Sequence, residues 1–191
     1  MTQREMVAEF MRRIGSETPS EPVDRGAAIE GIRTQLMLEE LRETHAAMLA
    51  GDLVETTDGL ADLAYVVVGT AVAYGLPIVD AYKLPAGKPR IPNTIDASAL
   101  ARNALQHLMM AVDAMARGDL FILEAALEAL NRTVAESAAS IGIPFREVFA
   151  EIQRSNMTKS QGKDIGPAKY PPGGKGPDYR PPNIASVLGL K

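Results

Sequence analysis

Apolar side chains recur every three to four positions along most of the chain, a spacing typical of α-helices that bury one face. In the first half, this spacing predicts three helices, at residues 4–14, 25–50 and 53–74. The buried stripe of the longest helix is expected to comprise Ile29, Ile32, Leu36, Leu41 and Met48. Asp52 stands where the third helix needs an N-cap, and Glu55 three residues later predicts a capping box.

A segment rich in Pro, Gly and Lys interrupts the pattern, and we interpret it as a linker. Helical spacing then resumes at residues 97–117, 120–140 and 144–156. From Thr158 to Lys191, recurring prolines exclude a regular element and predict a tail that either wraps the body or hangs free. We therefore expect one all-α domain, divided into residues 1–76, a linker 77–96, residues 97–157 and a tail 158–191.

The two halves of the helical pattern resemble each other at a fixed offset. A shift of 118 − 51 = 67 residues places Gly51-Asp52-Leu53 on Gly118-Asp119-Leu120, and Gly75-Leu76-Pro77 on Gly142-Ile143-Pro144. Chance similarity between Ala- and Leu-rich helices is the alternative, but one gapless register that aligns both corners favours duplication. The sequence thus predicts a helical bundle built from two duplicated antiparallel helix pairs, a fused pseudo-dimer.

Carboxylates are confined to the first copy of this repeat. Under the same shift Glu39, Glu40 and Glu43 become Gln106, His107 and Met110, while Asp58 and Asp62 become Ala125 and Ala129. On a helix, residues three or four apart share a face, and a tight corner makes the next helix an antiparallel neighbour. These acids are therefore expected to meet between two helices.

Clustered carboxylates repel one another unless a divalent cation lies between them, and Mg²⁺ and Mn²⁺ favour such oxygen ligands. A solvated acidic helix face is the alternative interpretation. Leu38, Leu41 and Leu63 beside the acids indicate that part of the face is buried. Glu39 and Glu40 point about 100° apart on a helix, so one of the two is expected near the rim.

Composition excludes several other functions. The chain has no Cys, which excludes a disulfide scaffold, a zinc ribbon and a thiol nucleophile. A net charge of −4 argues against binding a nucleic-acid polymer. The N-terminus is charged where a signal peptide would be apolar, and the apolar run of residues 63–74 is too short to span a bilayer. A cytoplasmic protein without membrane partners is predicted, in the host cytoplasm if phage-encoded.

The acidic segments resemble a known family. Leu38-Glu39-Glu40-Leu41-Arg42-Glu43 resembles the E-E-x-x-E half of the signature of MazG-like, all-α NTP pyrophosphohydrolases, and Asp58–Val66 resembles the E-x-x-D half. The segment Val148–Lys159 is similar to the closing motif of phage-type members, and Lys175–Ile184 to their tail. One departure is that the first acid of E-x-x-D falls on Gly59, for which Asp58 or Glu55 could substitute.

The resemblance implies an enzyme that cleaves the α–β phosphoanhydride of a nucleoside triphosphate, using two to three Mg²⁺ ions or Mn²⁺ in their place. The implied metal ligands are Glu39, Glu40, Glu43 and Asp62, with Asp58 as the substitute acid. Lys159 and Arg154 are expected to face phosphate charge, whereas Asn156 could bond a phosphate, the sugar or a metal-bound water. Tyr65 and His107 are candidates to contact the base, although a packing role is at least as compatible with each.

The resemblance specifies the substrate only coarsely. Phage-type relatives include dGTP-directed, MazZ-like enzymes, so dGTP or GTP is favoured over the pyrimidines dUTP and dCTP. A catalytically inactive helical assembly protein that retains the fold is the alternative from another functional class. A fused pseudo-dimer could be monomeric or assemble again into a homo-oligomer, a dimer or tetramer.

Overall fold

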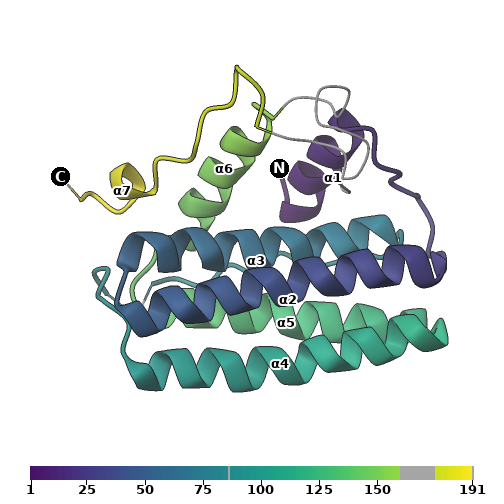
Figure 1. Ribbon diagram of the computed structural model, residues 1–191, viewed down its shortest axis with the longest axis horizontal. Coiled ribbons are helices and arrows are strands. Elements are labelled where there is room, and N and C mark those ends of the chain that lie inside the picture. The colour runs from purple at the N-terminus through teal and green to yellow at the C-terminus, as the bar shows by residue number, and fades with distance from the viewer. Residues whose placement is uncertain (86, 160–174, 191) are drawn as a thin grey trace.

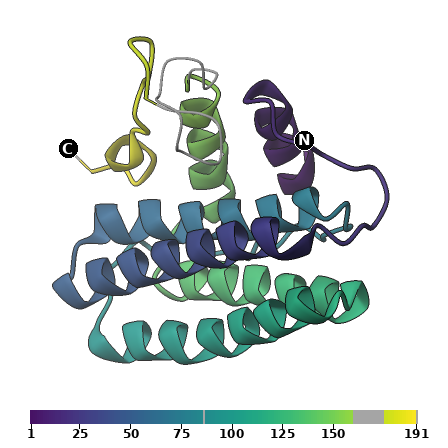
Figure 2. The same ribbon diagram turned by 45° about the vertical axis from the view of Figure 1, so that its right-hand side comes forward.

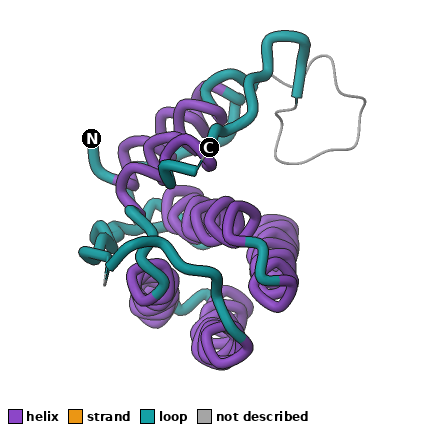
Figure 3. The backbone as a smooth tube through the Cα atoms, turned by 90° about the vertical axis from the view of Figure 1, so that its left-hand side faces the viewer, coloured by secondary structure: helices purple, strands orange, loops and turns teal. Residues whose placement is uncertain are grey.

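Helices alone form the regular structure of the part of the chain that the computed structural model describes, namely residues 1–85, 87–159 and 175–190. The all-α prediction is confirmed. Four long helices pack in two pairs, α2 (Gly26–Ala50) with α3 (Leu53–Ala73) and α4 (Thr94–Arg117) with α5 (Leu120–Ser140), and the pairs stack as two layers (Figure 1). Seen close to end-on, these helices form a four-helix bundle (Figure 3).

The two helix pairs share their local geometry at the offset of 67 residues. Gly51 and Gly118 end the first helix of each pair in the left-handed conformation, with φ of 68° and 66°. The aspartate after each glycine caps the next helix through its side chain. The bounds of α3 shifted by 67, 53 + 67 = 120 and 73 + 67 = 140, coincide with those of α5. The helix-pair arrangement therefore has the form that the repeat predicts.

At the N-terminal ends of α3, α4 and α6, the capping differs from the prediction. The helix α4 begins at Thr94 rather than residue 97, because Asn93 and Asp96 form a capping box. Asp52 caps α3 as predicted, but Glu55 does not complete a box, since the Asp52 N–H donates to Ala47 O at 3.1 Å. Pro144 is the N-cap of α6 (Phe145–Asn156) rather than part of its first turn.

A third layer lies on α3. The helices α1 (Gln3–Arg13) and α6 both contact α3 and each other, and they rise from the same side of the bundle (Figure 2). Because α3 packs against the bundle on one side and against this layer on the other, it is buried along nearly its whole second half. Its polar residues there are consequently held away from bulk water.

The buried stripe of α2 is displaced from the predicted one. Leu41 and Met48 are buried as predicted, but Ile29, Ile32 and Leu36 are only half-buried. Their places are taken by Arg33, Met37 and Thr44, which are 4%, 0% and 0% exposed. The prediction was wrong because it counted only apolar residues, whereas α2 presents polar side chains to α3. Leu38 was also expected near the buried face, and it is 41% exposed.

The described end of the tail wraps the body. It closes with a short helix, α7 (Ile184–Val187), which contacts α3 and α6 and buries Ile184 and Leu188. The prediction that the tail holds no regular element was wrong for this segment, because the last proline of the chain, Pro182, precedes it and Asn183 caps it through its side chain. The remaining tail residues 160–174, together with 86 and 191, lie outside the described residues. Among the described helices none has the length and hydropathy needed to cross a membrane.

Candidate active site

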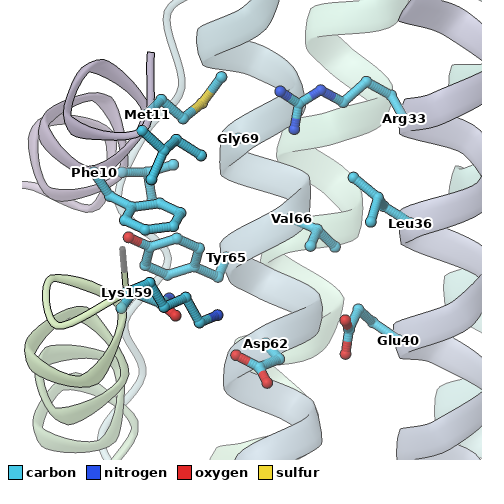
Figure 4. A pocket seen from close by; sticks show the side chains of 13 residues that line it. Phe10, Met11, Arg33, Leu36, Glu40, Asp62, Tyr65, Val66, Gly69 and Lys159 are labelled. Carbon is cyan, nitrogen blue, oxygen red and sulfur yellow. The ribbon is translucent and has the colours of Figure 1, made fainter. Parts of the chain in front are cut away.

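A cavity of about 170 Å³ lies where α1, α2, α3 and the end of α6 meet. It has a charged end and an apolar end, as the side chains in Figure 4 show. The lining residues are Val7, Phe10, Met11 and Ile14 of α1, Arg33, Leu36 and Glu40 of α2, Asp62, Tyr65, Val66 and Gly69 of α3, and Asn156 with Lys159. The sequence predicted five of these as site residues: Glu40, Asp62, Tyr65, Asn156 and Lys159.

Two carboxylates face the charged end from neighbouring helices. Burial raises the pKa of Glu40 to about 8, and the charges of Asp62, Glu43 and Glu39 add to this effect. Burial likewise raises the pKa of Asp62 to about 7, with Asp58 as the largest charge contribution. The structure thus holds two acids that repel each other in a poorly hydrated position, and a bound cation would stabilise their charged forms.

Lys159 lies opposite these acids. Its ammonium is 5.8 Å from the centre of the Phe10 ring, and burial lowers its pKa while the charges of Asp62, Glu40 and Asp58 oppose that shift. The lysine is placed there by the end of α6, where its backbone N–H donates to Asn156 O at 3.0 Å. One cation and two anions therefore share the charged end of the cavity.

A second lysine, Lys175 of the tail, lies close enough to the acids to affect their pKa values. Its charge lowers the pKa of both Asp58 and Asp62. Its ammonium is 5.2 Å from the centre of the Tyr179 ring. The sequence did not single out Lys175, because a lysine in a Pro- and Gly-rich tail gives no signal of where the tail returns.

Hydrogen bonds fix the returning tail to α6. Ser155 Oγ donates to Arg180 O at 2.9 Å, and Arg180 N donates to Thr158 Oγ1 at 2.9 Å. Arg154 is part of this attachment, because it pairs with Glu151 and donates to Pro181 O at 2.9 Å. Arg154 does not line the cavity, so the structure places this predicted phosphate contact in the attachment of the tail.

Tyr65 and Asn156 are both buried and line the cavity. The Tyr65 ring packs between Phe10 and Phe149, with ring centres 5.7 and 5.5 Å away. Its hydroxyl donates to Gln153 Oε1 at 2.6 Å. Tyr65 thus combines a packing role with a place on the cavity wall.

Gly59, where the E-x-x-D motif has its first acid, lies at a close approach of α2 and α3. A Cβ atom on Gly59 would lie 2.7 Å from Thr44 Oγ1 and 3.1 Å from Thr44 Cα. A glutamate at this position would therefore force the helices apart. Asp58 beside it has a pKa raised by burial and by the charge of Glu55, and its buried Oδ1 has no hydrogen-bond partner among the described residues.

Three other predicted site residues lie outside the cavity lining. Glu43 and Glu39 are exposed on α2, although the charges of both contribute to the raised pKa of Glu40. Glu39 lines a surface groove with Leu38 of its own helix and Val112 of α4. His107 is half-buried on α4, a helix that contributes no side chain to the cavity.

The donor chemistry of the site fits a hard divalent cation. Glu40 and Asp62 are repelling, half-buried carboxylates, and Asp58 Oδ1 beside them lacks a hydrogen-bond partner within the described chain. No three His, Asp or Glu side chains of the described residues are gathered closely enough to form a complete metal site. An ion held here would therefore draw the acid side chains together from their present positions.

A comparison with family models matches residues 7–83 to the family described as phosphoribosyl-ATP pyrophosphohydrolase. The matched residues make up less than half of the chain and include both segments that resemble the signature of the MazG-like all-α NTP pyrophosphohydrolases. This confirms the resemblance inferred from the motifs, and the phage-type branch stays a prediction. The family consists of hydrolases that act on phosphoanhydride bonds. Comparisons with curated proteins and with solved structures found no match.

The MazG-like segment, residues 7–83, contains all the acids of the site but only part of the cavity. It begins within α1 and ends in the linker after α3, so Glu40, Asp62 and Tyr65 lie inside it. Asn156, Lys159 and Lys175 lie beyond it. The lysines beside the acids are therefore contributed by a part of the chain that the family model does not cover.

Proposed function

We propose that this protein is a nucleoside triphosphate pyrophosphohydrolase that requires Mg²⁺, with Mn²⁺ able to substitute, and that releases a nucleoside monophosphate and pyrophosphate. One observation carries the proposal: Glu40 and Asp62 face Lys159 across a cavity, within a chain whose acid-bearing segment matches a pyrophosphohydrolase family. Buried acids beside a lysine suit a substrate that brings both metal ions and phosphate charge.

The proposed ligand set consists of Glu39, Glu40, Glu43 and Asp62, with Asp58 in place of the acid missing at Gly59. Two or three divalent ions held there would neutralise the phosphates and activate a water molecule. A glutamate of the set that is not fully used as a ligand would accept a proton from the attacking water as the water oxygen bonds to phosphorus and the α–β phosphoanhydride breaks. Lys159, with Lys175 from the tail, would compensate the negative charge of the phosphates during cleavage.

The favoured substrate is a guanine nucleotide, dGTP or GTP. The alternative is a pyrimidine deoxynucleotide, dUTP or dCTP. Phosphoribosyl-ATP, the substrate after which the matched family is described, belongs in the same comparison. The proposed binding partner of the cavity is thus a nucleoside triphosphate. All residues of the proposed site come from one chain, so the site does not depend on a homo-oligomer.

The test is incubation of the purified protein with each of these nucleotides in the presence of Mg²⁺ or Mn²⁺, followed by detection of pyrophosphate and monophosphate. We expect equimolar release of both products from at least one triphosphate, and none when the metal is chelated. Release of orthophosphate instead would contradict α–β cleavage. Absence of turnover with every nucleotide would favour the inactive assembly protein. That alternative does not explain why repelling acids are held beside a lysine.

A further inference from the structure

The apolar end of the cavity contains a buried arginine that neither the motifs nor the proposed reaction accounts for. Arg33 is 4% exposed and lines the cavity from α2. Figure 4 shows its guanidinium reaching from α2 toward Met11 and Gly69, at the opposite end from Glu40 and Asp62. Arg33 thereby places hydrogen-bond donors on the wall of the cavity, about two helical turns from the acids.

The spacing of the two ends suits one nucleoside. Arg33 and Glu40 are seven residues apart on α2, and Gly69 and Asp62 are seven apart on α3, which is about 10 Å along each helix. Phosphates held at the acid and lysine end would leave the sugar and base extending toward Arg33. The walls in between are the apolar side chains of Phe10, Leu36 and Val66, which suit the faces of a base.

Gly69 allows the Arg33 guanidinium to lie close against α3. A Cβ atom there would lie 3.3 Å from Arg33 Nη1, 3.6 Å from Val7 Cγ1 and 3.8 Å from Met11 Sδ. Glycine is less favourable than alanine inside a helix, and Gly69 lies in the interior of α3. The missing side chain therefore lets the guanidinium approach α3 and helps to hold it at this end of the cavity.

We propose that Arg33 determines base specificity by donating hydrogen bonds to the keto edge of the substrate base, which rests on the proposed nucleotide hydrolysis at the other end. A guanidinium carries only donors. It therefore pairs with guanine or hypoxanthine through O6 and N7, or with uracil through O4. Adenine and cytosine present an amino group at the corresponding position, so an N–H of the guanidinium would face an N–H of the base and no hydrogen bond would form.

The test compares kcat/KM for dGTP, dITP and dUTP with that for dATP and dCTP, in the wild type, Arg33→Gln and the exposed control Arg102→Gln. We expect the wild type to prefer the keto bases, and Arg33→Gln to lose roughly 10- to 100-fold on these while changing little on the amino bases. Arg102→Gln should leave every value unchanged. An equal loss on all bases in Arg33→Gln would show a phosphate or structural role and overturn the proposal.

Two further measurements keep the test decisive if Arg33→Gln does not fold. Gly69→Ala should fold, since alanine favours the helix and meets only the ends of side chains, and it should raise KM for dGTP at least tenfold. With the wild type, 7-deaza-dGTP lacks N7 and should be used roughly 10-fold less efficiently than dGTP if the purine is read at both atoms. Unchanged constants in both measurements would overturn the assignment for purines.

The proposal can also be separated from the hydrolytic activity itself. Calorimetric titration of the wild type with dGMP, dIMP, dUMP, dAMP and dCMP measures base recognition without turnover. Absence of hydrolysis with a preserved preference for keto monophosphates would reject the proposed reaction and retain the role of Arg33. Hydrolysis without any preference for keto bases in either assay would retain the proposed reaction and reject the role of Arg33.

Discussion

The Tyr65 hydroxyl donates a 2.6 Å hydrogen bond to Gln153 Oε1, and this buried bond joins α3 of the MazG-like segment to α6 outside it. Gln153 Nε2 in turn donates to Glu9 Oε2 of α1 at 3.3 Å. The three helices α1, α3 and α6, which all border the cavity, are thus linked through one glutamine. Asn156 and Lys159 follow Gln153 on the same segment, so this link also sets where they stand.

Removal of the hydroxyl should weaken that link without emptying the packed ring position. We expect Tyr65→Phe to lower the free energy of unfolding by about 1–3 kcal/mol, because a buried amide oxygen loses its donor. The same variant should raise KM more than it lowers kcat, since Lys159 shifts while the acids stay. Chemical denaturation and steady-state kinetics measure the two effects. Unchanged stability would show that water satisfies Gln153 equally well.

Loss of an acid from α2 should abolish hydrolysis. We expect Glu43→Ala and Glu40→Gln to lower kcat by about 10²-fold or more, a loss on the scale of removing a general base or a metal-activating group. Asp113→Asn is the control, because Asp113 forms an exposed pair with Arg117 on α4, away from the cavity. The measurement is pyrophosphate release at saturating Mg²⁺. Full activity in Glu43→Ala would show that the acid assignment is wrong.

Stability should depend on pH in a direction set by the raised pKa values of Glu40, about 8, and Asp62, about 7. Both lie above the ordinary values of 4.5 and 3.8, so between about pH 4 and pH 8 the folded chain binds more protons than the unfolded chain. This contribution is fully present below pH 4 and is lost as pH rises through the folded pKa values.

The measurement is Tm of the metal-free protein across pH 5 to 8.5, against the double variant Glu40→Gln with Asp62→Asn. We expect Tm of the wild type to fall more steeply with rising pH than that of the variant. Added Mg²⁺ should raise Tm of the wild type most at pH 8, where the acids are charged, and leave the variant nearly unchanged. Equal slopes with and without the two acids would contradict the electrostatic account.

The close approach at Gly59 can be tested with a matched glycine. Gly59→Ala should lower the free energy of unfolding by about 1–3 kcal/mol, because its Cβ would press on the backbone and side chain of Thr44. Gly31 lies within α2, where an added Cβ would meet open space, so Gly31→Ala should raise stability by about 0.5–1 kcal/mol. The measurement is thermal unfolding of both variants under the same conditions. If both substitutions stabilise the protein, α2 and α3 are not in close contact at Gly59.

Sequence periodicity and glycine corners were enough to predict helices α1 to α6 and the pairing of the four long ones, but not the short helix α7. Gly51 and Gly118, each followed by a capping aspartate, fixed the corners because a positive φ and an N-cap are local requirements. The buried face of α2 was predicted incorrectly, since Arg33 and Thr44 are buried by tertiary contacts that no local pattern encodes.

The acids of the candidate site could be predicted from the sequence. Lys175 and the arginine at the apolar end of the cavity could not. Glu40 and Asp62 follow a spacing that helical geometry brings to one level. Lys175 could not be placed, because its position depends on hydrogen bonds between Ser155, Thr158 and Arg180 far along the chain. Arg33 was missed because a lone arginine inside a helix usually lies on the surface.

The tail attachment yields the last prediction, that Lys175 acts on phosphate charge rather than on stability. Lys175 is exposed, and its charge opposes those of Asp58 and Asp62, so Lys175→Ala removes a cation from the site without removing packing. We expect KM for the triphosphate to rise about tenfold and Tm to change little. Lys88→Ala, an exposed lysine of the linker, is the control and should alter neither. If Lys175→Arg restores the wild-type KM, the charge is what matters. An unchanged KM in Lys175→Ala would instead mean that the tail serves only to cover α6.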